Sequence, residues 1–80
     1  MDILLDVVKV KTHPAYRLEL VFENGEQRVF DMSPYMEKKP FNRIKDPALF
    51  GCARIDYGTV VWPGNIDIAP ETLYDESRPA

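Results

Sequence analysis

The sequence is short of the residues that build covalent or metal-held frameworks. Its 80 residues include one cysteine, Cys52, and one histidine, His13. A single cysteine excludes an intrachain disulfide, and one Cys with one His is too few for a zinc site. The chain also lacks an apolar run near the ~20 residues of a membrane span, and its first residues lack a signal-peptide pattern. These absences predict a soluble cytoplasmic protein that binds no metal and does not enter a membrane.

Glycine is scarce and scattered, and positive charge is in the minority. The four glycines form neither a GxGxxG pattern nor a Walker motif, so a phosphate-binding loop is not expected. The net charge of −3 argues against direct binding to nucleic acid, because proteins that bind it usually have a basic surface. The mild basic cluster over residues 38–45 is typical of a solvated segment.

Cys52 and His13 are also the only pair of their kind that could act as nucleophile and base. A Cys–His dyad needs hydrogen-bond contact and an orienting third group, and nothing in the sequence places the two together. Cys52 beside Ala53 is instead typical of an inert thiol facing a core. We therefore expect no catalytic residue, no enzymatic activity and no cofactor.

The clearest pattern that is present is an alternation over residues 15–23. Tyr16, Leu18, Leu20 and Phe22 fall on one face, and this period of two predicts a half-buried strand. The segment Glu23-Asn24-Gly25-Glu26 that follows predicts a hairpin, because Asn and Gly tolerate positive φ.

Two registers of that hairpin are open. A two-residue turn places Glu23 opposite Glu26, which is an unfavourable like-charge pair. A type I turn with Gly25 in a bulge instead pairs residue 18 with 30 and residue 17 with 31. We favour the second register because it puts Phe30 and Met32 on the face of the leucines.

The remaining chain predicts short strands and helical turns. Further strands are expected over 3–12, 53–57, 59–62 and 65–68, with Tyr57 on the face of Ile55. Ser33 and Asp46 each precede a proline and are candidate N-caps, and Pro70–Tyr74 predicts a closing helical turn. The fold class is therefore α+β, a small antiparallel sheet of about five strands with two or three short helices. Residues 1–75 form the domain, and residues 76–80 are expected to be a loose tail.

The stretch from Thr59 to Tyr74 carries the main candidate for function. In one interpretation Trp62, the only tryptophan, anchors the core and Asp67 caps the Pro63-Gly64 corner. In the other, this stretch forms a binding face, since Trp and Tyr are frequent in interface hot spots. The candidate binding residues are Trp62, Asn65, Asp67, Tyr57 and Tyr74.

Several segments in order resemble the small bacterial family catalogued as domain of unknown function 2442. The matching segments are Leu18–Glu26, Phe30–Met32, Phe50, Val61–Pro63 and Asp67–Tyr74. The resemblance implies a small soluble α+β module of bacterial origin, without enzymatic activity or catalytic residues. Relatives are often encoded beside a second small protein, which implies a partner-binding role, regulatory or antitoxin-like.

Two functions from different classes are consistent with the sequence. The first is a protein–protein interaction module whose acidic surface meets another protein, or its own copy through the strand over 3–12. The second is a small-ligand sensor with a pocket lined by Trp62, Tyr57 and Tyr74, in which Asn65 and Asp67 supply the polar groups.

Overall fold

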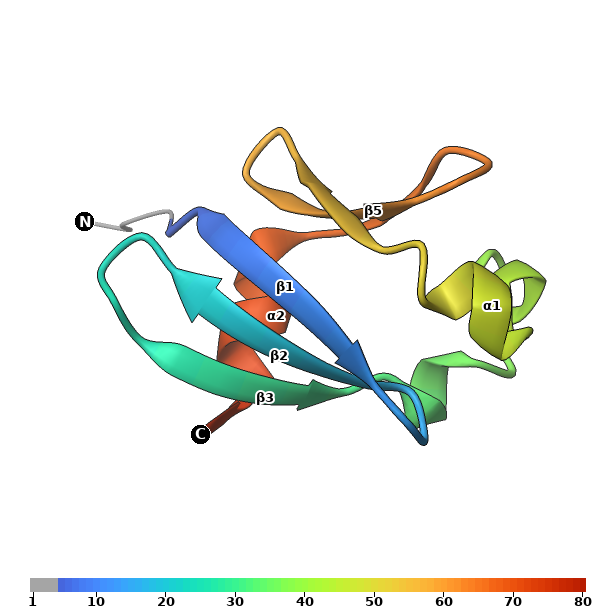
Figure 1. The fold of residues 1–80 in the computed structure, drawn as a ribbon, viewed down its shortest axis with the longest axis horizontal. Coiled ribbons are helices and arrows are strands. Elements are labelled where there is room, and N and C mark those ends of the chain that lie inside the picture. The colour runs from blue at the N-terminus through green and yellow to red at the C-terminus, as the bar shows by residue number, and fades with distance from the viewer. Residues whose placement is uncertain (1–4) are drawn as a thin grey trace.

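Two antiparallel sheets and short helices enclose one core in the computed structural model, which describes residues 5–80 (Figure 1). The large sheet has the order β1 (Val7–His13), β2 (Arg17–Phe22), β3 (Gln27–Asp31), β7 (Arg78–Pro79). The small sheet has the order β4 (Arg54–Asp56), β5 (Thr59–Trp62), β6 (Ile66–Ile68). The helices are α1 (Pro47–Phe50) and α2 (Pro70–Asp75), with 3-10 turns at Ser33–Tyr35 and Phe41–Ile44. The predicted antiparallel α+β class is confirmed, but the strands divide between two sheets instead of forming one.

The β2–β3 hairpin has the register that the apolar pattern favours. Leu18 pairs with Phe30 and Arg17 with Asp31. Gly25 has a φ of 87°, which is the left-handed conformation that closes a type I turn with a bulge. The register therefore places Leu18, Leu20, Phe22 and Phe30 on the inner face of the large sheet.

Strand β1 forms the outer edge of the large sheet and carries a bulge near its start. Val7 faces Phe22 and the next pair is Lys9 with Val21, so Val8 is left outside the register with 48% of its surface exposed. The strand ends at His13, as expected from the proline that follows. Residues 3 and 4 of the strand expected over 3–12 lie outside the described residues.

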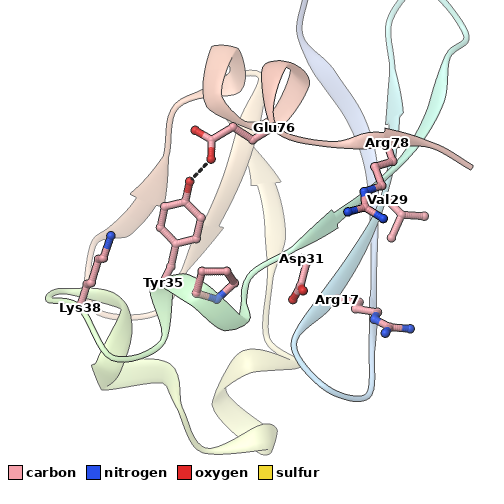
Figure 2. Close-up of a pocket in the computed structure, with 8 residues that line it drawn as sticks. Arg17, Val29, Asp31, Tyr35, Lys38, Glu76 and Arg78 are labelled. Atoms are coloured by element: carbon pink, nitrogen blue, oxygen red, sulfur yellow. Dashed lines mark hydrogen bonds between the residues drawn. The ribbon is translucent and has the colours of Figure 1, made fainter.

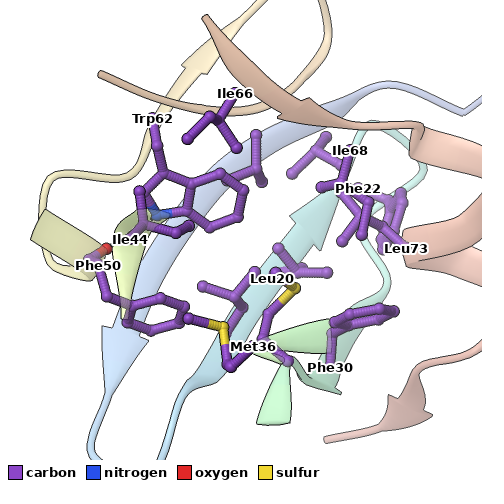
Figure 3. Packing of buried hydrophobic residues seen from close by; sticks show 14 residues of the cluster. Leu20, Phe22, Phe30, Met36, Ile44, Phe50, Trp62, Ile66, Ile68 and Leu73 are labelled. Atoms are coloured by element: carbon purple, nitrogen blue, oxygen red, sulfur yellow. Dashed lines mark hydrogen bonds between the residues drawn. The ribbon is translucent and has the colours of Figure 1, made fainter. Parts of the chain in front are cut away.

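The core lies between the two sheets, and Trp62 is one of its largest members (Figure 3). Trp62 is 1% exposed, stacks on Phe50 with ring centroids 5.9 Å apart, and donates from Nε1 to the Phe50 carbonyl at 2.9 Å. Leu18 and Leu20 of β2 are fully buried in the same cluster. The interpretation of Trp62 as a core anchor is confirmed, because the indole has both an apolar pocket and a partner for its N–H.

One of the two predicted helix caps is confirmed and the other is wrong. Asp46 accepts from the Ala48 N–H at 2.9 Å and caps α1, as expected. Ser33 makes no cap. The Asp31 carboxylate instead accepts from the Ser33 N–H at 2.9 Å and opens the 3-10 turn. An Asp two residues before a turn satisfies its first N–H in the same way as an N-cap, so Ser33 is not needed for this role.

The chain's last residues return to the large sheet. Arg78 pairs with Val29 and Pro79 with Arg28, so the expectation of a loose tail over 76–80 does not describe β7. The preceding Ser77 is buried and accepts from the Arg28 guanidinium at 2.6 Å. Proline is tolerated in β7 because it is an edge strand. Within residues 5–80, no helix has the length and apolar character needed to cross a membrane.

Candidate functional site

The turn between β4 and β5 is built from Tyr57 and Gly58, and both have positive φ, 53° and 74°. Two residues with positive φ form the type I′ turn that matches the twist of a short hairpin. Glycine adopts this conformation freely, and Asn or Asp adopts it at small cost, whereas a bulky side chain is strained there. Backbone conformation alone would therefore favour Gly, Asn or Asp over tyrosine at position 57.

Burial of the Tyr57 side chain does not offset the free-energy cost of this strained backbone conformation. Its side chain is 95% exposed, the highest exposure among the large apolar residues identified in the structure. The alternation of residues 53–57 predicts that Tyr57 lies on the inner face of the strand with Ile55, and this prediction is wrong. The strand ends at Asp56, and the turn rotates the tyrosine away from the core.

The neighbouring chain holds the turn firmly. The Val7 N–H donates to the Gly58 carbonyl at 2.9 Å, which joins the turn to β1. A Cβ at Gly58 would lie 2.5 Å from the Asp6 Oδ1 atom, so the two segments are in close contact. The exposed tyrosine thus projects from a fixed base, and little backbone entropy would be lost when it meets a partner.

The outer face of the small sheet extends from this turn. Arg54, Val61 and Asp67 are cross-strand neighbours on this face, while alternate residues of the strands point into the core. A shallow hollow of about 230 Å3 lies here. We call this surface the tyrosine face and define it by Arg54, Asp56, Tyr57, Val61, Asn65 and Asp67.

Charge on the tyrosine face is weakly negative and not fixed by strong pairs. Arg54 Nη2 lies 3.9 Å from Asp56 Oδ2, and both side chains are exposed. Such a pair contributes little in water and can be exchanged for contacts with a partner. Asp67 adds a second carboxylate, so acid exceeds base by one on this face.

The structure brings three of the five predicted binding residues together at the surface. Tyr57, Asn65 and Asp67 lie around the hollow, and Asn65 has a φ of 61° in the corner between β5 and β6. Trp62 lies beneath the hollow and is buried in the core. Tyr74 does not line the hollow, so the pocket expected between Trp62, Tyr57 and Tyr74 is not formed by these three residues.

Tyr74 instead joins α2 to the β2–β3 hairpin. Its ring packs edge-on against Phe22 with centroids 5.2 Å apart, the Arg28 guanidinium lies 4.5 Å from the ring centroid, and its hydroxyl donates to Glu26 Oε1 at 2.9 Å. That hydrogen bond, helped by Asn24 and Arg28, lowers the pKa of Glu26, and it raises the pKa of Tyr74. The role of Tyr74 is therefore to hold the helix in place.

Cys52 and His13 form no hydrogen bond with each other, and each has a different hydrogen-bond partner. Cys52 is exposed, which corrects the expectation of a buried thiol, and its Sγ lies 3.3 Å from the Ala48 carbonyl. Cys52 lies in the turn that follows α1, at the protein surface. His13 Nε2 lies 3.0 Å from Glu19 Oε1. Among residues 5–80, no three His, Cys, Asp or Glu side chains gather as metal ligands.

Sequence reasoning missed a second surface, a groove beside β3 and β7 (Figure 2). Its volume is about 630 Å3. We call it the cationic groove and define it by Arg17, Val29, Asp31, Pro34, Tyr35, Lys38, Glu76 and Arg78. These residues come from four separate parts of the chain. Two of the residues, Glu76 and Arg78, lie in the segment predicted to be a loose tail. No local pattern could therefore have shown that they form one surface.

Comparison with known proteins places this arrangement in one family. Neither curated proteins nor solved structures gave a match. A family model described as "Protein of unknown function (DUF2442)" matches residues 7–79, from the first residue of β1 into β7. The match covers almost the whole chain, including both sheets and the tyrosine face, and the chain belongs to the DUF2442 family.

Proposed function

We propose that this chain is a non-enzymatic protein–protein interaction module, and that the tyrosine face is its binding surface. One observation carries the proposal. Tyr57 is fully in water, strained at positive φ and fixed by the contact of its turn with β1. Strain that no packing compensates is typical of a functional position. Tyrosine is among the residues that most often anchor interfaces.

The chemistry of the face defines the partner. Val61 lies between Arg54 and Asp67 on the strands next to the tyrosine turn, so a partly exposed apolar side chain is flanked by charge. The partner surface that fits has an apolar pocket for the tyrosine ring and a basic rim that meets the excess of carboxylates. The net charge of −3 on the whole chain would speed the approach of such a basic partner.

A protein suits this surface better than a small molecule. The hollow of about 230 Å3 is smaller than the ~300–1,000 Å3 typical of small-ligand pockets, and its most prominent residue points outward. Such a module could regulate the protein that it binds, for example as an antitoxin. The exposed thiol of Cys52 supports a reducing bacterial cytoplasm as its setting.

We assign the partner as a protein other than a second copy of this chain. The edge of β1 was the expected route to a homodimer, but it carries the bulge at Val8 and the exposed side chains Lys9 and Lys11. Bulges and edge lysines are features by which proteins prevent strand pairing between copies.

The test is a parallel capture experiment from a lysate of the native host. The baits are wild type, Tyr57→Asn and the control Val8→Thr, which removes an exposed apolar side chain from β1. We expect one protein to be retained by wild type and Val8→Thr and lost from Tyr57→Asn. Asn is favoured at this turn position, so its loss of binding would not reflect misfolding.

Two outcomes would overturn the proposal. Equal retention by all three baits would show that Tyr57 is not the anchor. A dimer of the purified chain, measured by light scattering and reduced to a monomer by Tyr57→Asn, would assign the face to self-association instead.

A further inference from the structure

The cationic groove lies where the pairing of β7 with β3 stops. β7 pairs only with Arg28 and Val29, while β3 continues to Asp31. Beyond this point the chain diverges, and the groove lies between the outer face of the large sheet and the turn at Ser33–Tyr35. Figure 2 shows Lys38 on one side of the groove and Arg17 and Arg78 on the other, with Tyr35 and Asp31 between them.

The acids of the groove are already engaged. Asp31 accepts from the Ser33 N–H at 2.9 Å, and Glu76 accepts from the Tyr35 hydroxyl at 2.6 Å. The bonds from Ser33, with smaller contributions from the two arginines, lower the pKa of Asp31, and Glu76 raises the pKa of Tyr35. Both carboxylates are therefore held by hydrogen bonds from neighbours within the groove.

The cations of the groove are free by comparison. Within residues 5–80, none of Arg17, Lys38 and Arg78 forms an ion pair with a carboxylate. Lys38 Nζ lies 5.7 Å from the centroid of the Tyr35 ring, a contact that leaves its three N–H donors open. Three cations and two carboxylates line the groove, so it has a formal excess of one positive charge in a protein whose net charge is −3.

We propose that the cationic groove binds an acidic peptide segment of another protein, in which carboxylates flank an apolar residue. Arg17 and Arg78 would bind the carboxylates at one end and Lys38 those at the other. Val29, Pro34 and the Tyr35 ring would contact the apolar residue between them. Guanidinium groups are well suited to carboxylates because they can donate two parallel hydrogen bonds.

The arrangement favours a peptide over a small anion. The cations stand at opposite ends of the groove, with the Tyr35 ring and the hydrogen-bonded Asp31 carboxylate between them, so a single phosphate group could reach only one end (Figure 2). A chain with separated carboxylates reaches both, and the apolar residue between them uses surface that a phosphate would leave uncovered. The separation of the cations and their charge together therefore favour a peptide with two separated groups of carboxylates.

Fluorescence anisotropy with the full chain tests this proposal. The probe is a labelled peptide in which two Glu-Asp pairs flank a leucine, and the comparison peptide replaces the acids by lysine. We expect Arg17→Ala and Arg78→Ala each to weaken binding about threefold and the double variant about tenfold, as for exposed charge pairs. Arg54→Ala, the same change on the tyrosine face, is the matched control and should have no effect.

A variant of opposite sign sharpens the test. Glu76→Gln keeps an acceptor for the Tyr35 hydroxyl but removes a negative charge, so it should tighten peptide binding about twofold. Raising the salt from low concentration to about 0.15 M, where the Debye length is about 8 Å, should weaken binding of every variant that keeps the arginines.

Three results would overturn the proposal. The first is equal affinity of wild type and the double arginine variant, and the second is equal binding of the lysine peptide. The third is displacement of the acidic peptide by inorganic phosphate where sodium chloride of the same ionic strength has no effect, because this would assign the groove to a small anion. Tyr57→Asn should leave peptide binding unchanged, so this site stands or fails separately from the tyrosine face.

Discussion

Replacement of Tyr57 by asparagine is expected to stabilise the folded protein while removing its proposed anchor. The left-handed conformation costs an ordinary L-residue roughly 1–2 kcal/mol, and asparagine pays less. Because the tyrosine side chain is 95% exposed, its removal loses almost no buried apolar surface. The variant should therefore unfold with a free energy about 1 kcal/mol higher than wild type, which for a domain of this size raises Tm by about 4–8 °C.

Urea denaturation followed by circular dichroism measures this difference, and Tyr57→Ala is the control. Alanine removes the same ring but keeps most of the strain, so its stability should stay near that of wild type. The slope of free energy against urea should be the same for all three proteins, since the surface exposed on unfolding hardly changes. An asparagine variant no more stable than the alanine variant would refute the claim that Tyr57 is strained.

Three further predictions concern the supports of the fold. Trp62→Ala should lower the free energy of unfolding by about 3–5 kcal/mol through its cavity, a large share of the stability of so small a domain, and an unchanged urea midpoint would contradict this. Gly58→Ala should lower Tm because of its φ of 74° and the clash of the new Cβ with Asp6. Adding Asp6→Ala to this variant should restore only the part of the Tm loss that is due to the clash. The pKa of Glu26 is lowered by Tyr74, so the stability it contributes is present above the ordinary pKa of 4.5 and lost as the pH falls through the folded-state pKa. Glu26→Gln should therefore flatten the acid limb of a stability–pH curve, and an unchanged curve would refute this role.

Much of the fold could be predicted because it depends on local alternation. The spacing of Leu18, Leu20 and Phe22 fixes which face of β2 is buried, and Gly25 fixes the turn. Together they determine the register of the hairpin, since a slip of one residue would turn the whole apolar set outward. The burial of Trp62 follows from the size of the ring and the small number of competing residues.

The rest depends on contacts between distant segments. β7 has two residues, Arg78 and Pro79, and a strand so short has no period to detect. The cationic groove needs that strand in place, because one of its arginines is Arg78. Tyr57 differs from its predicted place because the strand pattern continues to residue 57, whereas β4 ends at Asp56 and a turn held by the contact of Gly58 with β1 follows.

The most direct test of the central claim, that Tyr57 anchors a partner, is photo-crosslinking in the native host. A photoreactive phenylalanine takes the place of Tyr57 in one strain and of the exposed Val8 in another. We expect one discrete crosslinked protein from position 57 and none from position 8. No adduct from position 57, or the same adducts from both positions, would contradict the claim.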